Sequence, residues 1–87
     1  MGSVGTLFLV ATPIGNLGDV SARALETLRT VAFVICEDTR RSRILLDAHG
    51  ISVPLVSMPA FAEGERAQSL VVRIAGGEDA VLITVGG

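Results

Sequence analysis

Four apolar stretches alternate along the chain with three stretches of helical periodicity, and this alternation is the feature that most limits the possible folds. The apolar stretches are short and bounded by turn residues, as strands buried in a parallel sheet are, and they cover residues 7–11, 31–36, 53–58 and 80–85. Strands that alternate with helices form parallel sheets with right-handed crossovers. The sequence therefore predicts an α/β fold, a four-stranded, mainly parallel sheet with flanking helices in the order β-α-β-α-β-α-β.

The composition indicates one small domain with an aliphatic core. The chain has 87 residues, of which 49% are hydrophobic, and its only aromatic residues are three phenylalanines. A net charge of −2 gives no overall basic footprint for nucleic acid. The single cysteine, Cys36, excludes an internal disulfide framework and indicates a reduced, intracellular setting. No apolar run reaches the roughly 18 residues of a membrane span, so we expect a cytoplasmic protein without membrane contact.

Turn and capping residues predict where the helices begin and end. Asp19 or Ser21 is expected to cap the first helix, and Asp38 or Thr39 the second. Gly50 is the expected residue just after the second helix. The apolar stripes of the three helices are expected to contain Ala24, Leu25 and Leu28, then Ile44, Leu45, Leu46 and Ala48, then Ala67, Leu70, Val71 and Ile74.

The stretch Thr12–Asp19 follows the first predicted strand and contains two glycines and a proline. In open parallel sheets, ligands bind beyond the carboxyl ends of the strands, and glycines let the backbone approach a ligand closely. The glycine spacing does not match the dinucleotide fingerprint, and the phosphate-loop Gly-Lys pair is missing. An ordinary connection and a ligand loop are equally compatible with this pattern. No residues have metal-ligand spacing, so no metal is predicted.

A second polar stretch, Glu37–Arg43, follows the second predicted strand and contains Arg40, Arg41 and Arg43 near the start of a helix. Positive charge is unfavourable there by about 0.3–1 kcal/mol per residue, because the helix dipole favours anions. Arginines beside free backbone N–H groups form a place for phosphate. The pattern favours contact with an anion or RNA, and the alternative is a surface ion-pair cluster with the neighbouring carboxylates that contributes little stability.

Two long motifs, Leu9–Asp19 and Cys36–Ser42, resemble the tetrapyrrole methylase superfamily. The similarity is greatest to its branch of small-subunit ribosomal RNA (cytidine-2′-O)-methyltransferases, and it runs from Leu7 to the end of the chain. The resemblance implies a dimeric, two-domain enzyme that uses S-adenosylmethionine to methylate ribosomal RNA. Residues 1–87 would be its N-terminal domain, ending at the cofactor loop, and the C-terminal domain would be absent from this chain.

The resemblance also implies positions for the site residues. The cofactor would lie against Pro13, Ile14, Gly15, Gly86 and Gly87. The candidates for RNA contact are Asn16, Asp19, Thr39, Arg40, Arg41 and Arg43. Glu37 and Asp38 are candidates, by position only, for a general base that removes the hydroxyl proton. The chain departs from the family pattern at Val85, where the family has an acid, and within residues 58–63.

Two other functions are compatible with the sequence. The chain could be a non-catalytic domain, either a degenerate homologue or a structural fragment that assembles through an exposed sheet edge, and the departure at Val85 favours this alternative. It could also belong to a methylase of small tetrapyrroles. The run Glu37–Arg41 favours the RNA branch over the tetrapyrrole branch, through resemblance alone.

Overall fold

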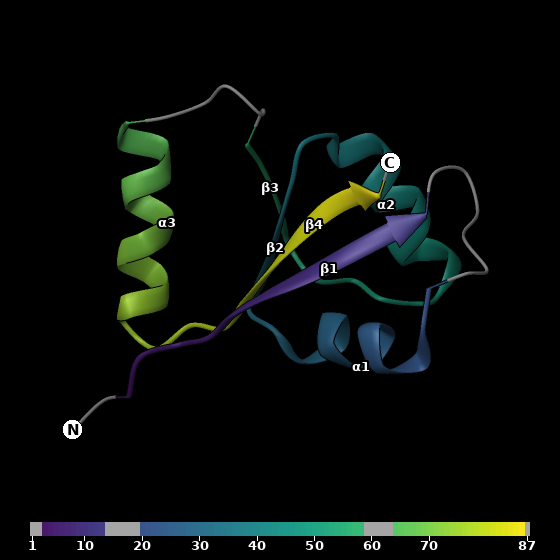
Figure 1. Ribbon diagram of the computed structural model, residues 1–87, viewed down its shortest axis with the longest axis horizontal. Coiled ribbons are helices and arrows are strands. Elements are labelled where there is room, and N and C mark those ends of the chain that lie inside the picture. Colours follow the sequence, from purple (N-terminus) through teal and green to yellow (C-terminus); the bar gives the residue numbers. More distant parts are fainter. Residues whose placement is uncertain (1–2, 14–19, 59–63, 87) are drawn as a thin grey trace.

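The described part of the chain forms a four-stranded parallel sheet flanked by helices (Figure 1). This computed structural model describes residues 3–13, 20–58 and 64–86. In chain order the elements are β1 (Leu7–Pro13), α1 (Ala22–Thr30), β2 (Phe33–Cys36), α2 (Thr39–Ala48), β3 (Leu55–Ser57), α3 (Glu65–Ala75) and β4 (Ala80–Gly86). The predicted fold class and element order are therefore confirmed.

The strands lie in the order β1–β4–β2–β3, so the last strand of the sequence lies inside the sheet. Leu82 of β4 pairs with Leu9 of β1 on one side and with Ile35 of β2 on the other. Cys36 of β2 pairs in turn with Ser57 of β3. Because every pair is parallel, all four strands end along one edge of the sheet. We call this edge, with the helix starts that border it, the carboxyl rim.

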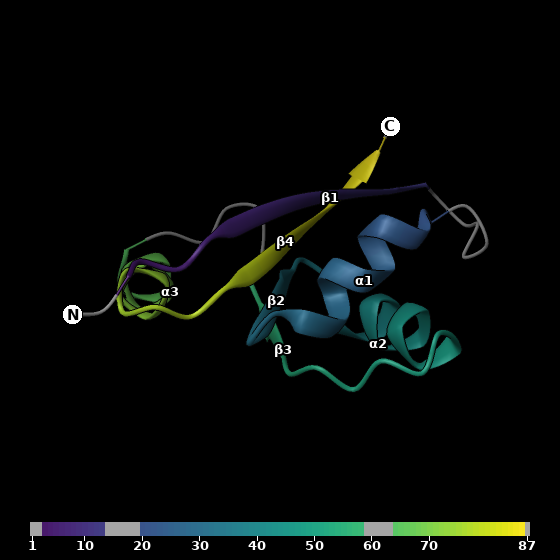
Figure 2. The same cartoon turned by 90° about the horizontal axis from the view of Figure 1, so that it is seen from below.

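Helices cover both faces of the sheet. α1 and α2 lie on one face and α3 lies on the other (Figure 2). Right-handed crossovers explain this division, because the chain crosses the sheet in one direction from β1 through β2 to β3 and returns from β3 to β4. None of the helices within the described ranges is long and apolar enough to cross a membrane.

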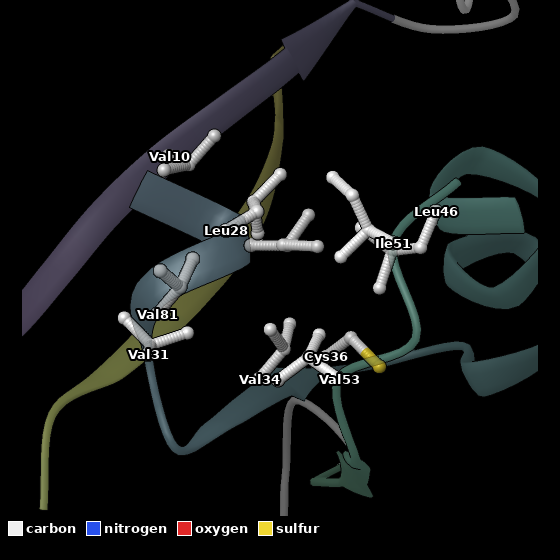
Figure 3. Packing of buried hydrophobic residues seen from close by; sticks show 10 residues of the cluster. Val10, Leu28, Val31, Val34, Cys36, Leu46, Ile51, Val53 and Val81 are labelled. Atoms are coloured by element: carbon white, nitrogen blue, oxygen red, sulfur yellow. The ribbon is translucent and has the colours of Figure 1, made fainter. Parts of the chain in front are cut away.

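Each face of the sheet has its own core. Figure 3 shows the first, in which Val34 and Cys36 of β2 pack with Leu28 of α1 and Leu46 of α2. The second core lies under α3 and contains Phe33, Ile35, Leu70 and Ala80. Successive residues of β2 thus point to opposite faces, and all four are buried. This double burial explains why the strand appears in the sequence as a continuous apolar run.

The strand boundaries differ from the predicted ones. β1 continues two residues further than expected, to Pro13. An edge strand tolerates proline where the missing N–H would face away from the neighbouring strand. Val31 and Ala32 lie before β2 and not in it, and the Ala32 N–H donates a hydrogen bond to the Asp79 carbonyl. β3 contains only Leu55–Ser57, which is half of the predicted stretch.

The predicted apolar stripes are partly wrong. Ile44 and Val71 are 61% and 62% exposed, and Ala48 is exposed as well. α2 and α3 contact the sheet along a narrower arc than their apolar residues cover, and periodicity alone does not reveal which part of that arc is buried, whereas the α1 stripe packs as predicted. Gly50 has a φ of 71°, as its predicted place after α2 requires.

One face of β1 is left bare. Val10 points into the first core, so its neighbours Leu7 and Leu9 point to the opposite face. They are 44% and 70% exposed, because α3 lies too far along the sheet to cover them (Figure 2). β1 therefore has an open edge and an uncovered apolar face in the described part of the chain.

Candidate functional site at the carboxyl rim

The carboxyl rim brings together the ends of the two strands that precede the polar stretches of the sequence. β1 and β4 end side by side, with Pro13 paired to Gly86. β2 also lies beside β4, but it ends earlier along the sheet. Ile35 of β2 pairs with Leu82, and β4 continues beyond that pair to Gly86. β1 and β2 therefore end at the same edge of the sheet, with β4 between them. The turn after β2 thus begins at the level where β4 still continues towards its end.

Asp38 fixes the start of α2 at this rim. Its Oδ1 accepts hydrogen bonds from the backbone N–H groups of Arg40, at 3.0 Å, and Arg41, at 3.3 Å. Asp38 is therefore the N-cap, and Thr39 is the first helical residue. Its neighbour Glu37 is exposed. Of the two candidate bases, the Asp38 carboxylate is engaged by the helix, whereas Glu37 faces solvent.

Arg40 and Arg41 point away from the fold. Both are exposed, and their guanidinium groups form no hydrogen bond or ion pair within the described residues. The capped first turn of α2 therefore presents two cations to solvent beside the ends of β2 and β4. Such an arrangement is suited to holding phosphate oxygens, because each guanidinium offers a planar fork of donors.

Arg43, by contrast, is engaged by the fold. Its Nη2 and Nη1 donate to the carbonyl oxygens of Ile51 and Val53, at 2.8 and 3.1 Å. Its Nε donates to Asp47 Oδ1, one helical turn further along, at 3.1 Å. These contacts hold α2 against the segment that leads into β3. They favour a structural role for Arg43 over the RNA contact predicted from the sequence.

Cys36, at the end of β2, belongs to the core as expected. Its side chain is buried, and burial raises the pKa of the thiol, while a hydrogen bond with Ser42 acts in the opposite direction. Ser42, itself buried, lies in the second turn of α2. A thiol held in its neutral form is a poor nucleophile, so Cys36 has a packing role.

Of the positions predicted for the cofactor, Pro13 and Gly86 lie within the described strands. Pro13 and Gly86 lie side by side at the strand ends, and a glycine without a side chain there lets a ligand approach the backbone closely. In open parallel sheets such strand ends are where ligands bind. The other predicted positions, Ile14, Gly15, Asn16, Asp19 and Gly87, lie outside the described residues.

Two further arginines, which are not among the predicted site residues, also lie at this rim. Arg23 is the second residue of α1 and Arg66 is the second residue of α3. Arg66 Nη1 donates to the carbonyl oxygen of Ser57, at the end of β3, at 2.8 Å. The signal that could have found both is their position in the first turn of a predicted helix, where a cation is unfavourable.

A shallow hollow of about 300 Å³ lies at the opposite edge of the sheet. It is lined by residues from the end of α1 and from the segment between α2 and β3, among them Arg29, Gly50 and Pro54. Arg29 donates from Nη2 to the His49 carbonyl at 3.1 Å, so its charge is engaged there. The hollow contains none of the predicted site residues.

Comparison with known proteins relates this arrangement to one family. Residues 6–87 match the family described as Tetrapyrrole (Corrin/Porphyrin) Methylases. The chain is 51% identical over 85 residues to the "Ribosomal RNA small subunit methyltransferase I" of Pseudomonas aeruginosa, which covers 98% of this chain and 30% of that protein. The proteins of the same name from Mesorhizobium japonicum and Escherichia coli O157:H7 are 47% and 38% identical, over 93% and 98% of this chain and 28% and 30% of their own lengths. The chain thus spans less than a third of these relatives.

Proposed function

The chain belongs to the tetrapyrrole methylase family, and from this premise we propose that it is the N-terminal domain of a methyltransferase that modifies small-subunit ribosomal RNA. The parent enzyme transfers the methyl group of S-adenosylmethionine to a ribose 2′-hydroxyl. It acts in the cytoplasm as a homodimer, and its C-terminal domain follows residues 1–87.

One structural observation supports this function most directly. Two exposed arginines, Arg40 and Arg41, stand on the capped start of α2, which follows the end of β2 at the same rim as the paired ends of β1 and β4. A nucleoside cofactor against the strand ends and an RNA phosphate against the arginines would thus be neighbours on one rim. The names of the matched relatives supply the class of substrate, a ribosomal RNA of the small subunit.

The reaction joins a ribose oxygen to a methyl carbon and breaks the bond between that carbon and sulfur. S-adenosylmethionine, when bound, supplies the electrophilic methyl group. The backbone at Pro13 and Gly86 would hold it, and Arg40 and Arg41 would orient the RNA through its phosphates, so that positioning accounts for much of the rate. Glu37 is the candidate to accept the hydroxyl proton, because the Asp38 carboxylate is already bonded to the start of α2.

The RNA contact is tested by Arg40→Ala combined with Arg41→Ala in the full-length protein. We expect weaker binding to small ribosomal subunits, and a salt dependence of log K that is flatter by about 0.7–0.9 for each phosphate that is no longer neutralised. Arg29→Ala, at the other end of α1, is the matched control, since Arg29 bonds to the His49 carbonyl. Unchanged binding of the double variant across a salt titration would remove the proposed role.

The extent of the cofactor site is tested by calorimetric titration of the 87-residue chain with S-adenosylmethionine. If later segments of the parent protein complete the site, we expect no measurable heat. Binding in the micromolar range would show that the strand ends of this domain are sufficient. Transfer of a labelled methyl group to small ribosomal subunits by the full-length protein then tests the reaction itself, and absence of transfer would contradict the proposed activity.

A further inference from the structure

The seven arginines of the chain fall into two groups that differ in their position relative to the carboxyl rim. One group, engaged by the fold, contains Arg29, Arg43 and Arg73. The other group lies at the carboxyl rim, at the second or third residue of each helix. It contains Arg23 of α1, Arg40 and Arg41 of α2, and Arg66 of α3.

The engaged arginines are satisfied within the molecule. Arg73 donates two hydrogen bonds of 2.9 Å to Glu78, and its guanidinium lies 3.9 Å from the centre of the Phe33 ring. Arg29 bonds to the His49 carbonyl. Arg43 bonds to two carbonyl groups and to one carboxylate, as described above. Arg43 and Arg73 thus stabilise the fold, whereas Arg29, with a single hydrogen bond to a carbonyl, differs from Arg66 in position and not in its contacts.

The rim arginines are not satisfied in this way. Arg23, Arg40 and Arg41 are exposed and form no side-chain hydrogen bond or ion pair in the described part of the chain. Arg66 donates one hydrogen bond from Nη1 to the Ser57 carbonyl, and the other N–H groups of its guanidinium remain for other partners. Three exposed carboxylates, Glu37, Asp38 and Glu65, also lie at this rim, yet none forms an ion pair with these arginines among the described residues. Cations at the positive ends of three helices, three of which have no partner in the described part of the chain, are suited to an external anion.

The backbone shows that the starts of α2 and α3 flank the same strand ends. Ser57, which holds Arg66, pairs with Cys36 of β2, and the Met58 N–H donates to the Cys36 carbonyl at 2.8 Å. Arg66 is thus one strand away from the turn that leads to Arg40. Figure 1 shows α2 and α3 beginning at the top and α1 at the right, the sides toward which the strands run.

We propose that Arg23, Arg40, Arg41 and Arg66, which we call the arginine rim, form one track for the phosphates of a single RNA strand. Arg23 and Arg66 then contact the same backbone as Arg40 and Arg41, on either side of them. This inference rests on the proposed function and extends the RNA contact from α2 to all three helices. A chain of regularly spaced phosphates suits cations spread along a rim, whereas a single small anion would reach one or two of them.

Two matched pairs of variants in the full-length protein test the track. Arg23→Gln is compared with Arg29→Gln at the other end of α1, and Arg66→Gln with Arg73→Gln at the other end of α3. Binding of a fluorescein-labelled single-stranded RNA of mixed sequence is followed by anisotropy over a range of salt concentrations. We expect each rim variant to flatten the slope of log K against log salt by about 0.7, and each control to leave it unchanged.

Arg66→Lys keeps the charge and should restore the slope, which separates the phosphate interaction of Arg66 from its hydrogen bond to Ser57. Circular dichroism confirms that every variant is folded at the assay temperature. If Arg23→Gln and Arg66→Gln leave the slope unchanged while the double variant of Arg40 and Arg41 flattens it, the track is wrong and the proposed function stands. If the control variants flatten the slope equally, the binding is diffuse and the track is overturned as well.

Discussion

At the scale of single residues, Asp38 determines where α2 begins. Its carboxylate accepts hydrogen bonds from two backbone N–H groups that would otherwise have no intrahelical partner. We expect Asp38→Ala to lower the free energy of unfolding by about 0.5–2 kcal/mol, measured by thermal denaturation. Glu37→Ala is the control, because Glu37 is exposed and adjacent. Equal effects of the two changes would show that the cap contributes nothing specific.

Glu78 makes the stability of the fold depend on pH in the acidic range. The hydrogen bond from Arg73 lowers the pKa of Glu78 below its ordinary value of 4.5. A carboxylate with a lowered pKa in the folded state adds stability above its unfolded pKa, and this stability is lost as the pH falls through the folded pKa. We therefore expect Glu78→Gln to lower the melting temperature at neutral pH and to converge with the parent chain in acid.

The control for this titration is Glu26→Gln, which removes an exposed carboxylate of α1 that has no ion pair in the described residues. It should leave the difference between neutral and acidic melting temperatures nearly as in the parent chain. If the melting temperatures of Glu78→Gln and the parent chain differ by the same amount at every pH, the ion pair with Arg73 does not stabilise the fold through the charge of Glu78.

At the scale of elements, α2 is held in place by a side chain near its middle. Arg43 reaches the carbonyl groups of Ile51 and Val53, so it ties the helix to the segment before β3. We expect Arg43→Ala to cost about 1–2 kcal/mol in urea denaturation, as removal of hydrogen bonds from a charged donor does. Arg43→Lys should recover part of this stability, since one ammonium cannot reach both carbonyl groups well.

The exposed Ile44 on the same helix supplies the control for this prediction. Ile44→Ala removes apolar surface that is already in water and should change the free energy of unfolding by less than about 0.5 kcal/mol. An effect of Arg43→Ala no larger than that of Ile44→Ala would contradict an anchoring role.

The elements themselves were largely predictable, since they depend on local pattern. Strands buried on both faces leave continuous apolar runs, and Gly50 marks the end of α2 through its left-handed backbone. What could not be predicted depends on partners distant in sequence. β3 is short because only Leu55–Ser57 pair with β2. The stripe residues Ile44 and Val71 are exposed because the sheet reaches only part of each helix.

The same distinction holds for the site. Its position followed from the parallel sheet, because strands that run together also end together. The roles of individual arginines did not follow. Arg40 and Arg43 belong to one short run of the sequence, yet only the course of the chain through Ile51 and Val53 shows that Arg43 turns inward. The position of Arg66 in the first turn of a predicted helix could be read from the sequence, but its bond to a carbonyl group at the end of β3 could not.

At the scale of the whole molecule, β1 is an edge strand of the sheet, with an open edge and a bare apolar face in the described part of the chain. It is seven residues long and has no charged residue, whereas short strands and charges normally protect an open edge. Leu9 on its bare face is 70% exposed. We expect Leu9→Lys to reduce the concentration-dependent association of the 87-residue chain in sedimentation velocity, with little change in melting temperature.

Val72→Lys is the matched control, because Val72 is 69% exposed but lies on α3 and away from the sheet edge. It adds the same charge to the molecule. If both variants reduce association equally, net charge and not the β1 edge governs it. If neither does, self-association through this edge is excluded as a role for the chain.

The central position of β4 has a consequence for how the protein is made. β1 leaves the ribosome first, but its neighbour in the sheet is the last strand to be synthesised. Until residues 80–86 have emerged, β1 and β2 have nothing between them, and the apolar side chains of both cores stay in contact with water. Pairing that joins the two ends of a sequence is slow and leaves such a chain open to aggregation. β1 and β2 can therefore be joined into one sheet only after residues 80–86 have left the ribosome.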